Sequence, residues 1–84
     1  MIRKVLRRLD QRWAAAFLEV IETGVADGSF TCADPAAAVA RVSALLDGLS
    51  VATLVYRSVT RAQLRQWVAG AVAGELGLDP ETLL

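Results

Sequence analysis

Few side chains in this sequence could do chemistry, and histidine is absent altogether. Its absence removes the usual general base, the commonest metal ligand and the Ser-His and Cys-His nucleophile pairs. Two pairs of carboxylates flank the expected loops at ordinary cap and surface positions: Asp27 with Asp34, and Asp79 with Glu81. Cys32 is the single cysteine, which excludes an intrachain disulfide and a thiolate cluster. No glycine-rich phosphate loop occurs, so we predict that the protein is not an enzyme and uses no cofactor or metal.

Asp47 is the one acid in the middle of an otherwise apolar stretch. A buried carboxylate without a partner is costly, so the sequence leaves three alternatives for it. Asp47 faces solvent, points into a polar pocket, or pairs with one of three arginines: Arg41, Arg57 or Arg65.

The first part of the chain has the apolar pattern of an amphipathic helix. Apolar residues recur at i, i+3, i+4 and i+7 from Ile2 to Ile21, which predicts a helix over about residues 2–26. Gly24 and Gly28 can each adopt the left-handed conformation that closes a helix, so a short loop should follow.

A second helix is expected from Pro35 to about Tyr56. Asp34 is a suitable N-cap, and the ring of Pro35 presets the first helical position. The helix is apolar around most of its circumference, which is typical of a helix covered on all sides, including by another subunit. Gly48 in its interior costs about 1 kcal/mol of helix propensity relative to Ala, and close approach of a neighbouring helix would compensate.

A third helix is expected over residues 61–76. Thr60 and Gln63 form a capping-box pattern at its start, and Gly77 is a suitable left-handed cap at its end. No stretch alternates apolar and polar residues with the period of a strand. We therefore predict an all-α protein with three helices in a single domain, residues 1–84.

The apolar content predicts an oligomer. Hydrophobic residues make up 55% of the 84 residues, more than so short a chain can hide in its own core. Gly70 and Gly74 give the third helix a small-residue surface against which a second backbone can pack. We expect a homodimer whose interface includes these residues: Leu45, Leu49, Thr53, Leu64, Trp67, Val68 and Ala71.

The charges balance, with nine basic and nine acidic residues, so no overall field attracts nucleic acid or an anionic membrane. Five of the basic residues lie within the first twelve positions: Arg3, Lys4, Arg7, Arg8 and Arg12. Such a run is usually a solvated helix face, and the alternative is a surface for nucleic acid or an acidic protein.

The chain is expected to be a soluble cytoplasmic protein. Residues 36–56 are long enough to be considered as a membrane span, but Arg41 and Asp47 make insertion unfavourable. A lone cysteine fits a reducing compartment.

A helix-turn-helix reading of the third helix is also possible. Arg61, Gln63, Arg65 and Gln66 stand near its start, where a recognition helix carries its base-contacting residues. The helix before it is long and apolar, however, and the intervening turn lacks the expected glycine. We therefore expect no direct DNA binding by this chain.

The order of these features resembles the C-terminal regulatory domain of TetR-type transcriptional repressors. The segments that carry the resemblance are, in order, Trp13 with Phe17, Gly24–Phe30, Asp34-Pro35, Leu45–Leu49 and Glu75–Asp79. The resemblance covers nearly the whole chain.

The resemblance implies a function as well as a fold. In that family the last two long helices form a four-helix bundle with those of a second subunit, and here they would be residues 35–56 and 61–76. The preceding helix helps to wall a small-molecule effector cavity, to which Trp13 and Phe17 would contribute. The alternative is that these two aromatic side chains only pack in the hydrophobic core.

Nothing in the 84 residues corresponds to the family's N-terminal DNA-binding domain, so this polypeptide alone should neither recognise an operator nor enclose an effector. It is expected to be either the remnant or excised portion of a longer regulator, for example from a shortened gene model beginning at Met1, or a stand-alone dimerisation module. A different class of function is a small helical adaptor whose Arg-rich first helix binds nucleic acid or an acidic protein.

Overall fold

The computed structural model describes residues 2–83, without the side chains of residues 2, 3, 5–10, 80 and 82. It consists of three α-helices and a final 3₁₀ turn: α1 (Ile2–Ala26), α2 (Pro35–Leu54), α3 (Arg61–Leu76) and η1 (Pro80–Leu83). The prediction of an all-α fold with three helices is confirmed.

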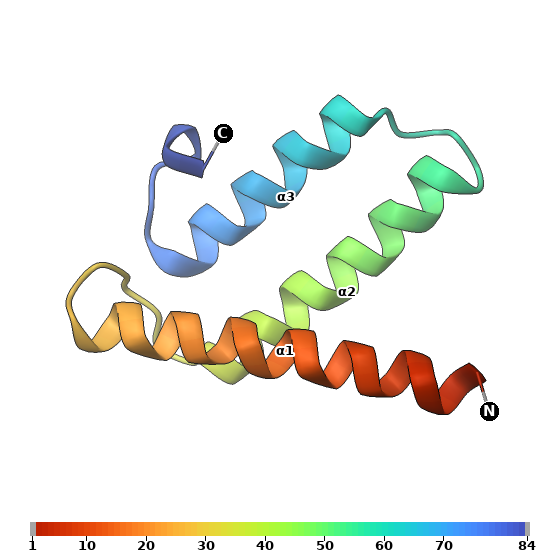
Figure 1. The fold of residues 1–84 in the computed structure, drawn as a ribbon. Coiled ribbons are helices and arrows are strands. Elements are labelled where there is room, and N and C mark those ends of the chain that lie inside the picture. The colour runs from red at the N-terminus through yellow and green to blue at the C-terminus, as the bar shows by residue number, and fades with distance from the viewer. Residues whose placement is uncertain (1, 84) are drawn as a thin grey trace.

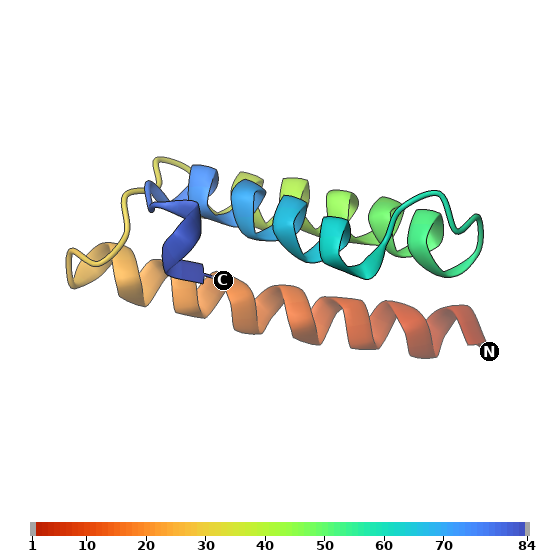
Figure 2. The ribbon, with the colours of Figure 1, turned by 90° about the horizontal axis from the view of Figure 1, so that it is seen from above.

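The helices lie in two layers. α2 and α3 run antiparallel, side by side, and α1 lies beneath them as the second layer (Figure 2). Figure 1 shows that α1 crosses the N-terminal end of α2, whereas the turn between α2 and α3 lies far from α1. The Cα atoms accordingly extend 38 × 32 × 16 Å.

The hydrophobic core lies where the end of α1 meets the beginning of α2 and the end of α3. Ile21, Ala38, Val39 and Leu76 form its centre. Half-buried apolar side chains surround this centre: Ala14, Phe17, Leu18, Phe30, Cys32, Val72 and Leu78. Ile21 is the only large side chain that is fully buried among those described, so the core is small even for a chain of this length.

The caps explain where the helices begin and end. The Asp34 carboxylate accepts the N–H of Ala37 at the start of α2. At the start of α3 the Thr60 hydroxyl accepts the N–H of Gln63, whose side chain accepts the N–H of Thr60. Gly77 ends α3 in the left-handed conformation, with φ 67°.

α2 ends at Leu54, two residues before the expected Tyr56. Arg57 adopts φ 55°, a left-handed conformation that is strained for a residue with a Cβ. The N–H groups of Tyr56 and Ser58 turn back to the carbonyls of Val51 and Ala52. The chain therefore leaves the helix early, where the sequence shows no glycine or proline.

Gly24 does not close α1, contrary to expectation. It lies inside the helix, whereas the left-handed position is at Gly28, with φ 85°. The ring of Phe30 lies against the Cα of Gly24, and a Cβ there would overlap the ring. The N–H of Phe30 also donates to the Gly24 carbonyl at 3.0 Å. Glycine is thus required for packing of the loop on α1.

Arg41 joins α2 to α3 through Glu75. The guanidinium donates from Nε to Oε1 at 2.6 Å and from Nη2 to Oε2 at 2.7 Å, which is a bidentate pair. This hydrogen bond holds the pKa of Glu75 below its ordinary value of 4.5. Arg41 is therefore engaged elsewhere, and Asp47 is exposed, the first of the alternatives that the sequence left open.

Replacement of Gly24 by Ala should destabilise the fold. The added Cβ forces the Phe30 ring to move, and overpacking of this kind lowers the free energy of unfolding by about 1–3 kcal/mol. Thr23→Ala, at the exposed neighbouring position, is the matched control and should change it by less than about 0.5 kcal/mol. Urea denaturation measures both, and equal stability of the two variants would contradict the packing role of Gly24.

Replacement of Arg41 by Gln should raise the pKa of Glu75 toward its ordinary value. Because the folded pKa is lowered, the pair stabilises the fold above the unfolded pKa of Glu, and this contribution disappears as pH falls through the folded pKa. An NMR titration of the Glu75 carboxyl carbon measures the shift, with Arg12→Gln as control. An ordinary Glu75 pKa in the parent chain would show that the pair does not persist in solution.

Candidate functional site

Large apolar side chains remain exposed along α2, α3 and the turn between them. Tyr56 is 74% exposed and Trp67 is 46% exposed. The others on these elements are Leu45, Val51, Leu54 and Val55. An apolar surface of this kind marks a site for a ligand or a partner chain.

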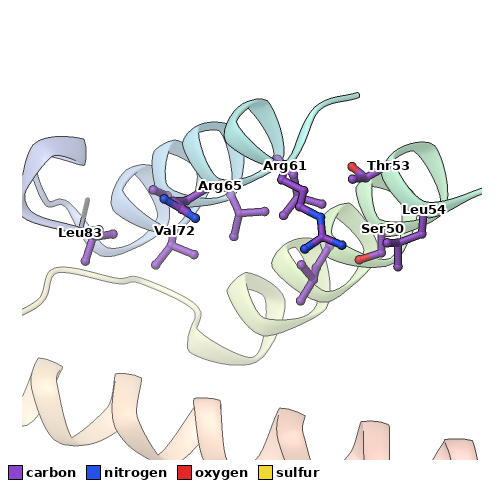
Figure 3. Close-up of a pocket in the computed structure, with 11 residues that line it drawn as sticks. Ser50, Thr53, Leu54, Arg61, Arg65, Val72 and Leu83 are labelled. Atoms are coloured by element: carbon purple, nitrogen blue, oxygen red, sulfur yellow. The ribbon is translucent and has the colours of Figure 1, made fainter. Parts of the chain in front are cut away.

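One face of the α2–α3 pair is hollowed into a groove of about 670 Å³. Its walls come from both helices, with Leu83 of η1 at one end (Figure 3). The lining residues are Leu46, Ser50, Thr53, Leu54, Arg61, Leu64, Arg65, Val68, Ala69, Val72 and Leu83. The groove is therefore mainly apolar, with two arginines and no acid among the side chains that line it.

The opposite face carries small residues. On α3, Gly70 and Gly74 each stand two residues after a groove residue, Val68 and Val72, and two residues turn a helix by about 200°. Gly48 on α2 has the same relation to Leu46. Nothing lies within 4 Å of the place where a Cβ would stand at any of these three glycines.

We call this second surface the glycine face, and define it by Gly48, Ala52 and Val55 on α2 and by Trp67, Gly70, Ala71 and Gly74 on α3. The predicted close neighbour of Gly48, Gly70 and Gly74 is not another part of the described chain. The space outside them is open, and it lies beside the exposed Trp67.

The seven residues predicted for the dimer interface divide between these surfaces. Thr53, Leu64 and Val68 line the groove. Trp67 and Ala71 belong to the glycine face, four residues apart on α3.

Leu45 and Leu49 lie four residues apart on α2, between the groove and the glycine face. Leu45 is 36% exposed and Leu49 is half-buried. The seven predicted residues therefore do not by themselves assign the interface to one of the two surfaces.

Trp13 and Phe17 lie together on α1 but line none of the described cavities. Their ring centroids are 5.3 Å apart with planes tilted by 52°. Phe17 packs on the core cluster, whereas Trp13 remains 41% exposed. Their effector-pocket role stays a prediction.

The Arg-rich start of α1 is described only in part. Lys4 and Arg12 are exposed. The side chains of Arg3, Arg7 and Arg8 lie outside the described residues. Among residues that the structure does describe, no group of three or more His, Cys, Asp or Glu side chains is placed to hold a metal.

Sequence reasoning missed the groove as a site. Arg61 and Arg65 stood out as residues of a recognition helix, and Arg65 also as a possible partner of Asp47, yet both share one helix face with the groove residues Val68 and Val72. The i, i+4 spacing of the two arginines beside an apolar stripe was the available signal. The spacing could not indicate where α2 lies, and α2 supplies the other wall of the groove.

Most of the chain matches a known protein family. The family model described as BetI-type transcriptional repressor, C-terminal, matches residues 1–77. The match covers all three α-helices and the Gly77 cap. No curated protein and no solved structure matches the chain significantly.

Proposed function

The chain belongs to the TetR family as a BetI-type C-terminal domain, and on this premise we propose that it is the dimerisation and effector-responsive part of a transcriptional regulator. The resemblance found in the sequence is thereby confirmed. The family is non-enzymatic, so the prediction that the chain is not an enzyme is also confirmed. TetR C-terminal domains typically dimerise.

The observation that carries the dimerisation proposal is the open space outside Gly48, Gly70 and Gly74. Without a Cβ at these positions, a second pair of helices can approach closely, because interaxial distance depends on the side chains at the contact. Burial of the exposed Trp67 in the same contact would remove a large apolar surface from water. Two copies joined in this way form a four-helix bundle.

The chemistry of the two faces favours the glycine face over the groove as the interface. A twofold-symmetric contact places the same surface of each copy together. Contact through the groove would bring Arg61 and Arg65 of both copies into one interface, where like charges repel. The glycine face, as defined above, contains no charged residue.

Insertion into a membrane could also explain why α2 is apolar around most of its circumference. Within residues 2–83, α2 is the one helix long and apolar enough to cross a bilayer by length and composition. Regulators of this family are soluble cytoplasmic proteins, so we propose that another subunit covers α2 and that this chain is cytoplasmic too.

Replacement of Ala71 by Arg should dissociate the dimer. Ala71 lies between Trp67 and Gly74 on the glycine face, and an uncompensated charge buried there costs several kcal/mol (about 3–5 when a buried charge loses its partner). Analytical ultracentrifugation at micromolar concentration should show two chains per particle for the parent and one for the variant. The melting temperature of the parent should fall over about a hundredfold dilution, as expected for a dimer.

Two further variants make this experiment decisive. Gln11→Arg adds the same charge at an exposed position of α1, outside both surfaces, and it should leave the dimer intact. Thr53→Arg places the charge in the groove and should also leave it intact. Dissociation by Thr53→Arg but not by Ala71→Arg would transfer the interface to the groove, and a well-folded monomeric parent would refute the proposal.

The chain alone should not bind duplex DNA in a sequence-dependent manner. Its formal net charge is zero, and α3, with Arg61 and Arg65 at its start, lines a groove of this chain. An electrophoretic mobility assay at physiological salt should give no saturable, sequence-dependent shift. A shift whose affinity falls steeply with salt and is lost in Lys4→Gln/Arg12→Gln would instead favour the adaptor function.

A further inference from the structure

The groove changes character along its length. Toward η1 its walls are apolar, with Val68, Val72 and Leu83. From Arg61 to Val72 it follows α3 for about 16 Å, at about 1.5 Å per residue. A cavity of this shape suits an extended apolar body rather than a compact polar molecule.

Cations gather at the other end, near the turn between α2 and α3. Arg61 extends from α3 toward α2 (Figure 3). A smaller cavity of about 310 Å³ adjoins the groove there and shares Thr53, Leu54 and Arg61 with it. Arg57 also lines this smaller cavity, so two arginines face it, whereas Arg65 lies farther along the groove beside Val72 (Figure 3).

No acid balances these arginines within the described residues. The ion pair of the α2–α3 layer is that of Arg41 with Glu75, and neither residue lines the groove. Asp47, the nearest acid in sequence on α2, is exposed and lines neither space. The cations are therefore available to an anion brought by a ligand.

Two details mark the arginine end as a shaped site. Arg57 is held at φ 55°, and strained backbone of this kind is found at ligand-binding positions more often than elsewhere. Thr53 lines both spaces, and its hydroxyl oxygen is buried without a hydrogen-bond partner among the described residues.

We infer that the groove binds a single-chain amphiphile with a carboxylate head at Arg57 and Arg61 and its apolar chain along Val68 and Val72. The inference rests on the effector-responsive role proposed above and names the class of effector. It departs from the expectation that the chain alone encloses no effector, because residues of this chain form the groove. A carboxylate matches the planar fork of a guanidinium. A phosphate head would find fewer backbone donors at the start of α3, because the N–H groups of Gln63 and Leu64 are already bonded to Thr60.

Calorimetric titration of the full chain with sodium decanoate, below the concentration at which micelles form, tests the inference. One molecule should bind per chain. Decyltrimethylammonium has the same tail and the opposite charge, and it should not bind in the groove. Acetate has the head without the tail and should give no measurable binding either, since apolar contact supplies most of the affinity.

Variants connect the binding to the groove. Arg57→Gln with Arg61→Gln should weaken decanoate binding by at least about tenfold, because the carboxylate loses both of its charged hydrogen-bond donors. Arg12→Gln removes the same kind of charge from α1 and should bind as the parent does. Val68→Trp fills the groove without changing charge and should abolish binding. Circular dichroism checks that each variant is folded.

Several outcomes would overturn the inference: no saturable binding, equal binding of the cationic amphiphile, or parent-like binding by the Arg57→Gln, Arg61→Gln variant. Ultracentrifugation of the same samples keeps the two proposals apart. A monomer that binds decanoate would refute dimerisation and support the carboxylate site. A dimer that binds only decyltrimethylammonium would keep the effector-responsive role and refute the carboxylate.

Discussion

Ile21 fills the space between Ala38, Val39 and Leu76, and this contact determines how the three helices meet. The buried side chains contributed by α2 and α3 include three alanines: Ala38, Ala69 and Ala73. Small side chains let the helices approach closely, but they bury little apolar area. The core therefore holds one end of the α2–α3 pair on α1, while the other end extends beyond it (Figure 1).

Two apolar surfaces follow from this one-ended core. α2 is apolar around its circumference, and the core covers only its first turns, at Ala38, Val39 and Val42. Its later turns show one side to the groove and the other to the glycine face. The two sides differ in charge, since Arg61 and Arg65 line the groove whereas no charged residue belongs to the glycine face. They also differ in shape, since the glycines leave open space. An uncharged surface with open space suits a contact between identical chains, whereas a groove lined by arginines suits a charged small molecule.

The elements were predictable from the sequence because their signals are local. The Asp34 cap, the Thr60–Gln63 capping box and the Gly77 cap each act within a few residues, and helices α1 and α3 have the expected bounds. The early end of α2 was not predictable, because Arg57 takes a conformation that its residue type disfavours.

The site was less predictable because its contacts are distant in sequence. Arg41 and Glu75 are separated by 34 positions, so the charge pattern alone did not pair them. Gly24 was correctly singled out, but for the wrong reason. It does not close α1; glycine is needed there because the Phe30 ring folds back on it. Apolar periodicity identified helix faces that pack against another element or a partner, but it did not show which residues line the groove and which form the glycine face. That distinction needs the position of the neighbouring helix.

The antiparallel arrangement of α2 and α3 also bears on how the chain folds. A turn of a few residues joins them, so their mutual contacts form between segments close in sequence, which favours rapid folding. The loop from Asp27 to Ala33 is instead closed over a long distance, by the N–H of Thr31 donating to the Leu76 carbonyl at 2.9 Å. Closure of that long segment carries the larger entropic cost. We therefore expect the α2–α3 hairpin to form before the Thr31–Leu76 hydrogen bond that ties the loop to the end of α3.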